Sequence, residues 1–480
     1  MNTKSVIQTS GIAFGTSGAR GLVVDFTPQV CAAFSIAFSQ SIKSEFAFNT
    51  MAIAIDNRPS SFDIAKACAA GLKQLNIDVV YYGVVPTPAL AYTAMQDNMP
   101  CIMVTGSHIP FDRNGLKFYR PDGEITKQDE QAILSTDFDF TDLSLVDISL
   151  PTSDKAKNAY TARYTNLFSE EALGGKRVGI YEHSSAGRDI YKALFEQLGA
   201  EVICLGRSDE FIPIDTEAVS DEDKQRAKKW VSEYHLDMLF STDGDGDRPL
   251  VAGEDGEWLR GDILGLLCSQ ALSIEALATP VSCNTAIELS GSFKTVTRTK
   301  IGSPYVIEAF AKLNKTYKRV AGFEANGGYL LASDFEFNGK ALKALPTRDA
   351  LLPALVLATM GDSIASLQIS LPQRFTASDR LKNFPQEKSL KLVTLLKTEP
   401  QRICSLLDIS SLDVIHGDDT DGVRLHLSNG AIVHIRPSGN APELRCYIEA
   451  GEYSIIQRYL KSFTTNFESN LNAELIDSNF

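Results

Sequence analysis

Short hydrophobic runs return along the chain in a pattern that predicts an α/β fold. Nine of these runs read as strands, and stretches with helical apolar spacing, such as Phe62–Leu75, separate them. The predicted strands are Met51–Asp56, Asp78–Val85, Cys101–Thr105, Arg177–Glu182, Ala200–Gly206, Asp237–Ser241, Thr279–Asn284, Val296–Gly302 and Arg319–Phe323. Because the same β-α-β-α-β order occurs three times, we expect three homologous α/β domains.

The third strand of each repeat ends in an unusual loop, and a further short strand follows that loop. The loops read TGSHIPFDRN, TDGDGDR and EANGG, and the strands after them read GLKFY, PLVAG and YLLAS. We therefore expect mixed sheets. Loops from equivalent positions would meet in one central cleft, where we expect the active site.

The end of the chain has a different pattern. Ser428-Asn429-Gly430 lies between the alternating runs Gly422–Leu427 and Ala431–Ile435, which predicts a β-hairpin. Leu444–Glu449 alternates as another strand, and Tyr453–Phe467 has helical apolar spacing. These elements predict a small C-terminal α+β domain.

Changes in composition give the domain boundaries. The polar stretch Thr141–Asn158 joins the first repeat to the second, and the turn at Asp255-Gly256-Glu257 precedes the third. Ser370–Glu387 holds two prolines and mixed charge, which indicates a hinge. The predicted domains are 1–150, 151–255, 256–370 and 371–480.

Composition indicates which binding partners and which cellular compartment to expect. With 480 residues and a net charge of −14, the chain is not expected to bind nucleic acid or an anionic membrane. Residues 1–15 have no apolar signal core, and the apolar stretch Ala350–Met360 is too short to span a bilayer. The eight cysteines are scattered without a CxxC pair, so we expect reduced core residues and a cytoplasmic protein.

The metal loop (residues 243–248) is the strongest chemical signal. Asp243, Asp245 and Asp247 alternate with glycine, so their carboxylates can converge on one hard cation. A solvated acidic turn is the simpler alternative. An EF-hand is a second alternative, but Arg248 stands where that loop needs glycine and the flanks read as strands. Mg²⁺ is favoured over Ca²⁺ because it commonly binds a few carboxylates together with a phosphate oxygen.

Three other loops carry polar groups suited to a sugar phosphate. Ser107, in the serine loop (residues 105–113), follows a buried strand and is either a nucleophile or an ordinary turn residue. Glu324 and Asn326, in the sugar loop (residues 324–328), suit hydroxyl groups, although such a pair is also common in turns. The phosphate loop (residues 436–440) begins with Arg436, which is a phosphate ligand or a surface residue.

Together these loops supply a hydroxyl nucleophile, a metal site, hydroxyl binders and a phosphate clamp. Lys117 and Arg20, the latter in the glycine-rich stretch Phe14–Gly21, add positive charge near the nucleophile. This set predicts phosphoryl transfer on a sugar phosphate.

The chain resembles the α-D-phosphohexomutases along its whole length. TGSHIP is similar to the active-site serine loop of that family, DGDGDR to its metal loop, FEANGG to its sugar loop and RPSGNAP to its phosphate loop. The resemblance implies that Ser107 carries the phosphoryl group and that Arg20, His108 and Lys117 surround it. The implied ligands of Mg²⁺ are phosphorylated Ser107, Asp243, Asp245 and Asp247.

The resemblance also implies a substrate site. Its residues are Arg248, Ser303, Glu324, Asn326, Arg436, Ser438, Gly439 and Asn440. Three of them depart from the common family pattern: Asn326 stands in place of Ser, Asn440 in place of Thr, and Ser303 where mannose/glucose mutases often have His.

The motif set is most similar to that of bacterial phosphomannomutases. This similarity implies interconversion of mannose 6-phosphate and mannose 1-phosphate through a phosphoserine enzyme and a hexose 1,6-bisphosphate, which also serves as activator. It further implies a supply of GDP-mannose and a monomer or small homo-oligomer. The alternatives are a phosphoglucomutase, a phosphoglucosamine mutase, a sugar-phosphate phosphatase and a catalytically inactive sensor.

Overall fold

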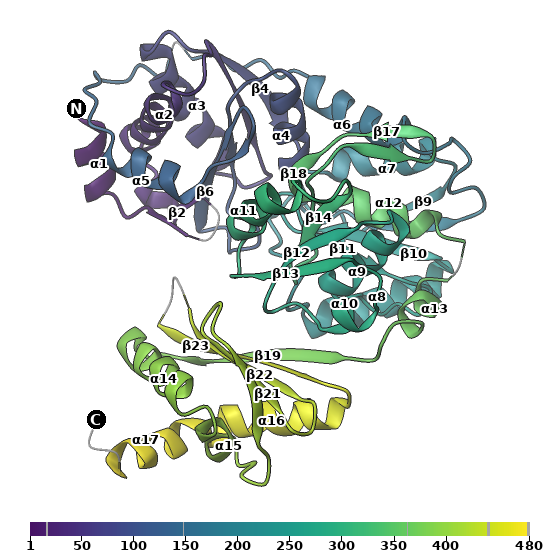
Figure 1. The fold of residues 1–480 in the computed structure, drawn as a ribbon. Helices are drawn as coiled ribbons and strands as arrows, with labels where there is room; N and C mark the ends of the chain where they lie inside the picture. Colours follow the sequence, from purple (N-terminus) through teal and green to yellow (C-terminus); the bar gives the residue numbers. More distant parts are fainter. Residues whose placement is uncertain (16–17, 147, 362, 439–441, 478–480) are drawn as a thin grey trace. The chain divides into compact units, whose positions relative to one another are not determined.

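The computed structural model describes the chain except residues 16–17, 147, 362, 439–441 and 478–480 (Figure 1). Residues 1–277 and 302–368 form one compact unit, and residues 278–301 and 369–480 form a second. Gly439 and Asn440 of the predicted phosphate loop therefore lie outside the described residues. The predicted boundaries of the four domains stay predictions.

The first sheet of the large unit is mixed. Its strands run in the order β1-β2-β6-β5-β3-β4, with β7 paired to β6. Their bounds are β1 Ala13–Phe14, β2 Ala19–Leu22, β3 Thr50–Ile55, β4 Asp78–Val84, β5 Cys101–Val104, β6 Arg113–Arg120 and β7 Gly123–Glu124. Strands β4, β3 and β5 are parallel, and β6 is antiparallel to β5 with Phe118 opposite Ile102. Because β3 and β5 are buried along nearly their whole length, their sequences are almost continuously apolar.

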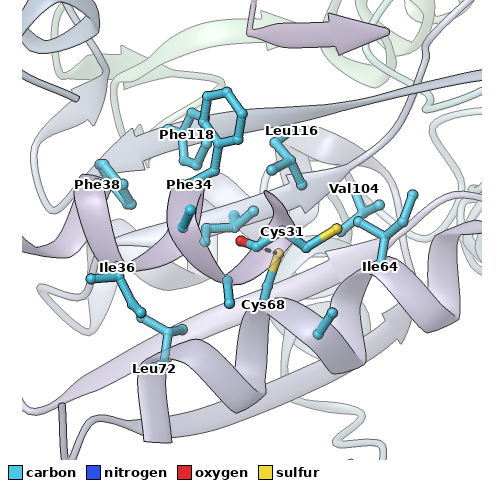
Figure 2. Packing of buried hydrophobic residues seen from close by; sticks show 14 of the residues in the cluster. Cys31, Phe34, Ile36, Phe38, Ile64, Cys68, Leu72, Val104, Leu116 and Phe118 are labelled. Atoms are coloured by element: carbon cyan, nitrogen blue, oxygen red, sulfur yellow. Dashed lines mark hydrogen bonds between the residues drawn. The ribbon is translucent and has the colours of Figure 1, made fainter. Parts of the chain in front are cut away.

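Helices α2 (Pro28–Ile42) and α3 (Ser61–Gln74) pack against each other over this sheet. The Oγ1 of Thr27 caps α2 by accepting the N–H of Val30 at 3.3 Å, and proline at the first helical position suits this start. Figure 2 shows the core between these helices and the sheet, where Phe34 stacks on Phe118 with ring centroids 6.4 Å apart. Each large side chain buried in this way contributes about 1.5–3 kcal/mol.

The cysteines largely agree with the predicted reduced core. All eight are free, and seven are buried. Cys31 and Cys68 lie within the core of Figure 2, where the Sγ of Cys68 contacts the carbonyl oxygen of Cys31 at 3.6 Å. Cys204 is the exception, because it is exposed on β9 (Glu201–Leu205).

The second sheet repeats the centre of the first. Its order is β11-β10-β8-β9, with β9, β8 and β10 parallel and β11 antiparallel to β10. The bounds are β8 Arg177–Tyr181, β9 Glu201–Leu205, β10 Met238–Thr242 and β11 Pro249–Ala252. Strands β11-β10-β8-β9 therefore correspond in order to β6-β5-β3-β4. The repeat read from the sequence is confirmed for these two sheets.

The third repeat presents the same kind of hairpin. Strand β14 (Val320–Phe323) is antiparallel to β15 (Tyr329–Leu331), which is antiparallel to β18 (Leu345–Asp349). The strand predicted at Thr279–Asn284 is misplaced, since β12 spans Ala276–Pro280. Pro280 ends this strand, and the N–H of Cys283 closes a turn onto its carbonyl at 3.0 Å.

The small unit is built on an antiparallel sheet, as predicted for an α+β domain. Its order is β19-β23-β22-β21-β20. The bounds are β19 Phe375–Lys382, β20 Val414–Asp418, β21 Val423–Leu427, β22 Ile432–Pro437 and β23 Glu443–Ala450. Within the predicted hinge Ser370–Glu387, residues Phe375–Lys382 form β19 and pair with β23, so the prediction is wrong for these eight residues and stays a prediction for the rest of the stretch. This edge strand is polar and largely exposed, so it lacks the hydrophobic signal of a strand.

Further elements complete the two units. The helices are α1 Thr3–Thr9, α4 Thr87–Gln96, α5 Lys127–Ser135, α6 Lys155–Thr165, α7 Arg188–Gln197, α8 Asp221–Tyr234, α9 Gly261–Ala271, α10 Ala286–Leu289, α11 Ser303–Leu313, α12 Leu351–Thr359, α13 Ile364–Ile369, α14 Gln386–Thr398, α15 Arg402–Leu406, α16 Tyr453–Thr465 and α17 Phe467–Asp477. The remaining short elements are the 3₁₀ helix Val23–Asp25 and strands β13 Thr295–Thr299, β16 Phe335–Phe337 and β17 Lys340–Leu342. None of the described helices combines the length and the apolar character that crossing a bilayer requires.

Candidate active site

The serine loop joins β5 to β6 and holds Ser107 in a buried, strained conformation. Ser107 has a φ of 56°, in the left-handed region that residues other than glycine occupy only where contacts hold them. Its N–H donates to the Oγ1 of Thr105 at 2.7 Å, and its carbonyl accepts from the Nη2 of Arg58 at 2.9 Å. These contacts fix the serine backbone at the end of a buried strand.

Two glycines allow the serine loop to be approached closely from both sides. A Cβ on Gly106 would lie 2.7 Å from the Cζ of Arg58. A Cβ on Gly244 would lie 2.7 Å from the carbonyl oxygen of Ser107. Glycine at these positions thus lets the serine loop pack against Arg58 and against the metal loop.

The metal loop joins β10 to β11 and gathers three buried carboxylates. One oxygen each of Asp243, Asp245 and Asp247 lies within 4.8 Å of the others. The hydroxyl of Ser107 donates to the Oδ2 of Asp243 at 2.7 Å. The structure therefore brings the predicted nucleophile and the three predicted metal ligands together, and the flanking strands agree with the exclusion of an EF-hand.

The hydrogen bonds of these carboxylates leave two oxygens without a donor. Asp243 uses its Oδ1 to accept the N–H groups of Asp247 and Arg248, each at 3.3 Å. The Oδ1 atoms of Asp245 and Asp247 are buried and accept no hydrogen bond from the described residues. Such oxygens are costly unless something pairs with them, and they fit a hard divalent cation.

The ionisation of the carboxylates differs from one to the next. Burial and the charges of Asp245 and Asp247 raise the pKa of Asp243 well above its usual range. Burial also opposes ionisation of the other two, but Lys117 lowers the pKa of Asp245 and Arg348 lowers that of Asp247. The two carboxylates with unpaired oxygens are therefore the ones that stay charged.

Two buried cations hold these carboxylates directly. The Nζ of Lys117 lies 2.5 Å from the Oδ2 of Asp245 and 2.6 Å from the Oδ2 of Asp247. The Nε of Arg348 donates to the Oδ2 of Asp247 at 3.0 Å. Because these contacts use the Oδ2 atoms, they leave the unpaired Oδ1 atoms for a metal ion.

Two further arginines lie beside the group. The Nε of Arg248 is 3.6 Å from the Oδ1 of Asp247 and 3.8 Å from the Oδ2 of Asp243. Arg20, on β2, has a buried Nε that finds no partner among the described residues. Burial, followed by the charges of Arg248 and Arg348, lowers the pKa of Arg20 to about 10. An arginine with an unpaired donor in this position suits an anion.

His108 lies beside Ser107 as predicted, but it is uncharged. Its Nδ1 accepts from the Nη1 of Arg248 at 2.9 Å and is 3.4 Å from the Oγ of Ser107. Burial, and then the charge of Arg248, lowers the pKa of His108 to about 3. His108 therefore orients Arg248 and adds no positive charge.

The sugar loop forms a tight turn between β14 and β15. The N–H of Gly327 donates to the carbonyl of Glu324 at 2.9 Å, and the Oδ1 of Asn326 accepts the N–H of Gly328 at 3.0 Å. The Oε2 of Glu324 accepts from the Nη1 of Arg348 at 3.2 Å. The Oε1 of Glu324 and the Nδ2 of Asn326 form no hydrogen bond with the described residues, so one acceptor and one donor remain for a ligand.

Ser303 begins α11 in the same unit. Its hydroxyl donates to the Oε2 of Glu124 at 2.8 Å and accepts from the Nη1 of Arg348 at 3.3 Å. The hydroxyl of Thr347 donates to the other oxygen of Glu124 at 2.7 Å. Ser303 therefore already has protein partners, and its contact with substrate stays a prediction.

The phosphate loop lies in the small unit. Arg436 is in β22, half-buried, and forms an ion pair with the Oδ1 of Asp421 at 3.3 Å. The backbone N–H of buried Ser438 donates to the carbonyl of Glu443 at 2.9 Å. The role of this loop, including Gly439 and Asn440, stays a prediction.

Sequence reasoning did not identify four residues that complete the site. They are Arg58, Thr87, Glu124 and Arg348. Arg348 connects the metal loop to the sugar loop, and Thr87 donates to the Oδ2 of Asp245 at 2.5 Å. The available signal for Arg348 was the charged pair Arg348-Asp349 directly before an apolar run.

Models of protein families match three parts of the chain. Models described as phosphoglucomutase/phosphomannomutase alpha/beta/alpha domain I, alpha/beta/alpha domain III and C-terminal domain match residues 11–139, 260–375 and 397–465. The protein is an isomerase of the phosphohexomutase class. The chain belongs to the phosphoglucomutase/phosphomannomutase family, as the four loops predicted.

Individual proteins are similar over almost the full length. A phosphomannomutase of Salmonella muenchen is 56% identical over 472 residues, which cover 98% of each chain. A phosphomannomutase of Sinorhizobium fredii is 42% identical over 92% of this chain and 96% of its own. A solved phosphoglucomutase/phosphomannomutase family protein from Burkholderia thailandensis, 19% identical, has the same fold with a TM-score of 0.70 over 97% of both chains.

Proposed function

We propose that the protein is a Mg²⁺-dependent phosphomannomutase that interconverts mannose 6-phosphate and mannose 1-phosphate. The contact between Ser107 and the metal loop carries this proposal. The hydroxyl of Ser107 lies 2.7 Å from Asp243, within a group of three buried aspartates in which two oxygens accept no hydrogen bond from the described residues. The full-length similarity to two phosphomannomutases supports mannose as the sugar.

In this proposal phosphorylated Ser107 gives its phosphoryl group to the free hydroxyl of a hexose phosphate. The phosphorus–oxygen bond to serine breaks, a bond from phosphorus to the sugar oxygen forms, and the proton of the sugar hydroxyl ends on the serine oxygen, which yields a hexose 1,6-bisphosphate and free Ser107. The opposite transfer, from the other end of the bisphosphate, restores the phosphoserine. The same bisphosphate would act as activator by phosphorylating Ser107 in enzyme that has lost its phosphate.

The charges around Ser107 suit this chemistry. Four cations, Lys117, Arg20, Arg248 and Arg348, face the three aspartates and Glu324. Mg²⁺ bound by the aspartates would supply two further positive charges, and a phosphoserine carries about −1.5 to −2. Lys117 and Arg20 would hold the phosphoryl oxygens, and the burial of Ser107 would limit the access of water.

The remaining loops would bind the substrate. Glu324 and Asn326 would bind ring hydroxyls through the oxygen and the nitrogen that form no hydrogen bond with the described residues. Arg436, Ser438, Gly439 and Asn440 would hold the phosphate that is not transferred. We further propose that the product supplies GDP-mannose synthesis and that the enzyme acts in the cytoplasm as a monomer or small homo-oligomer.

A substrate panel read by phosphorus NMR tests the proposal. Mannose 1-phosphate, Mg²⁺ and a trace of glucose 1,6-bisphosphate should give mannose 6-phosphate, and the Ser107→Ala variant should give almost none. Faster conversion of glucose 1-phosphate or glucosamine 6-phosphate would assign the enzyme to those sugars instead. Release of inorganic phosphate as the main product would identify a phosphatase.

A further inference from the structure

Arg58 lies directly behind the serine loop, in the turn between β3 and α3, and its guanidinium group is fully enclosed. Its side chain has 0% exposure, as does that of Asp56, its ion-pair partner at 3.1 Å. The ring of Phe211 covers the guanidinium with its centroid 3.9 Å from the Cζ. The side-chain hydrogen bonds of Arg58 to the described residues go to Asp56 and to the serine loop and not to the metal loop, so we expect its role to be exerted through the serine loop.

Every donor of the guanidinium is used, and four of the five acceptors are backbone carbonyls of the serine loop. Nη2 donates to the carbonyls of Ser107 and Ile109 at 2.9 and 2.5 Å. Nη1 donates to those of Pro110 and Arg113 at 2.7 and 3.0 Å. Nε donates to the Oδ2 of Asp56 at 3.1 Å. One planar cation thus gathers carbonyls from both ends of the loop that carries Ser107.

The second half of this network reaches the serine from the other side. The hydroxyl of Thr105 donates to the Oδ2 of Asp56 at 2.7 Å and accepts the N–H of Ser107 at 2.7 Å. Asp56 and Arg58 therefore hold both the N–H and the C=O of Ser107, the residue with a left-handed φ. A backbone strained in this way keeps its conformation only while such contacts remain.

We propose that Arg58 is a positioning residue that sets the direction of the Ser107 hydroxyl for phosphoryl transfer. This inference rests on the proposed role of Ser107. Lysine cannot replace Arg58, because an ammonium is a point donor with at most three N–H bonds and no planar fork. A displacement of about 1 Å at a reacting atom can cost on the order of a hundredfold in rate, so the effect should fall on kcat.

The test uses the full-length enzyme and mannose 1-phosphate, or whichever hexose phosphate wild-type enzyme turns over. For Arg58→Ala and Arg58→Lys we expect kcat to fall about a hundredfold while KM changes by less than about threefold. Guanidinium chloride at millimolar concentration should restore at least about a tenth of kcat to Arg58→Ala, because the enclosed cavity has the shape of that ion, but not to Arg58→Lys.

Arg319 is the matched control, since it also donates to a backbone carbonyl, that of Leu272 at 3.0 Å, away from the serine loop. Arg319→Ala should keep kcat and respond to guanidinium no more than wild-type enzyme does. If Arg58→Ala does not fold, Gly106→Ala tests the same contact from the loop side, because its Cβ would lie 2.7 Å from the Cζ of Arg58. That variant should lose kcat selectively as well.

The phosphorus resonance of phosphoserine gives a readout that does not depend on turnover. It should shift in Arg58→Lys and stay in place in Arg319→Ala. Wild-type enzyme that gains no phosphoserine during incubation with Mg²⁺ and glucose 1,6-bisphosphate would refute the proposed function itself. The positioning role would be overturned if Arg58→Lys or Gly106→Ala kept the kcat of wild-type enzyme, or if these variants raised KM without lowering kcat. Either result would leave the proposed function intact.

Discussion

The metal loop and the sugar loop follow equivalent strands of two α/β repeats, yet they hold their carboxylates in different ways. The metal loop buries three aspartates close together and leaves one oxygen each of Asp245 and Asp247 without a hydrogen-bond donor among the residues that the structure describes. The sugar loop has a single carboxylate, Glu324, and Arg348 already pairs one of its oxygens. Lys117 and Arg348 offset part of the charge of the first arrangement but leave two oxygens that suit a bound cation, whereas in the second an arginine of the protein already pairs with the carboxylate.

This difference separates two tasks that the same strand–loop–strand unit can perform. A group of like charges that is costly without an ion is suited to bind that ion tightly and to act on the transferring phosphate. A single paired carboxylate beside an amide is suited to accept and donate hydrogen bonds to hydroxyls. Variants in the metal loop should therefore change the response to Mg²⁺, and variants in the sugar loop should change the response to substrate.

The largest effect is expected for Asp245→Asn. This change removes one charged ligand and leaves Lys117 with one carboxylate fewer. Mg²⁺ affinity, measured as the metal dependence of turnover, should fall by at least about tenfold to a hundredfold, with a matching loss of rate at low Mg²⁺. The exposed Asp209→Asn, whose side chain is 96% exposed, serves as the control and should change neither quantity.

Activity of chelator-treated wild-type enzyme without metal would contradict this assignment. So would an Asp245→Asn variant with an unchanged Mg²⁺ titration. In either case the difference between the two loops would not be a difference in metal binding.

A smaller effect is expected for Glu324→Ala, and it should concern the reaction with substrate and not the binding of Mg²⁺. The change leaves a sugar hydroxyl without its acceptor and Arg348 without one partner, at a cost of about 1–3 kcal/mol. We expect kcat/KM for mannose 1-phosphate to fall roughly tenfold to a hundredfold while the Mg²⁺ titration stays the same. Glu324→Gln, which keeps the acceptor and the size, should lose less.

If Glu324→Ala lost as much Mg²⁺ affinity as Asp245→Asn, the distinction between the two loops would not hold. An unchanged kcat/KM on mannose, glucose and glucosamine phosphates would place sugar recognition elsewhere, and Ser303 would be the next residue to substitute.

The sequence predicted that Ser107 and the three aspartates lie at the ends of buried strands, because the signals for these residues are local. Asp243, Asp245 and Asp247 are two residues apart, so spacing alone indicates convergence, and Ser107 follows an apolar strand that periodicity reveals. Arg58 and Arg348 were not identified from the sequence, because the contacts that place them in the site are with residues far away in the chain. Arg348 contacts a residue 101 positions earlier, and Arg58 contacts residues 49–55 positions later. No local pattern marks an arginine that will be buried.

The errors in secondary structure have a similar origin. Strand β19 was missed because an edge strand with polar, exposed positions carries no alternation, and its pairing with β23 lies 61 to 75 residues away. The succession of strands and helices along the first two repeats was predicted, since each element depends on a local pattern of buried residues. Pairing that depends on distant partners was not.

The smallest effect, and the sharpest test of the comparison, is expected for Arg348→Lys. Arg348 bonds both loops, through Nε to Asp247 and through Nη1 to Glu324. Lysine keeps the charge but cannot span both carboxylates with a fork. We expect roughly tenfold losses, about 1.4 kcal/mol each, in Mg²⁺ affinity and in kcat/KM. Arg319→Lys is the control and should change neither quantity.

A loss in only one quantity would mean that the two loops work independently and that Arg348 supports one of them. Losses in both, combined with single-quantity losses in Asp245→Asn and Glu324→Ala, would identify Arg348 as the residue through which the metal loop and the sugar loop depend on each other.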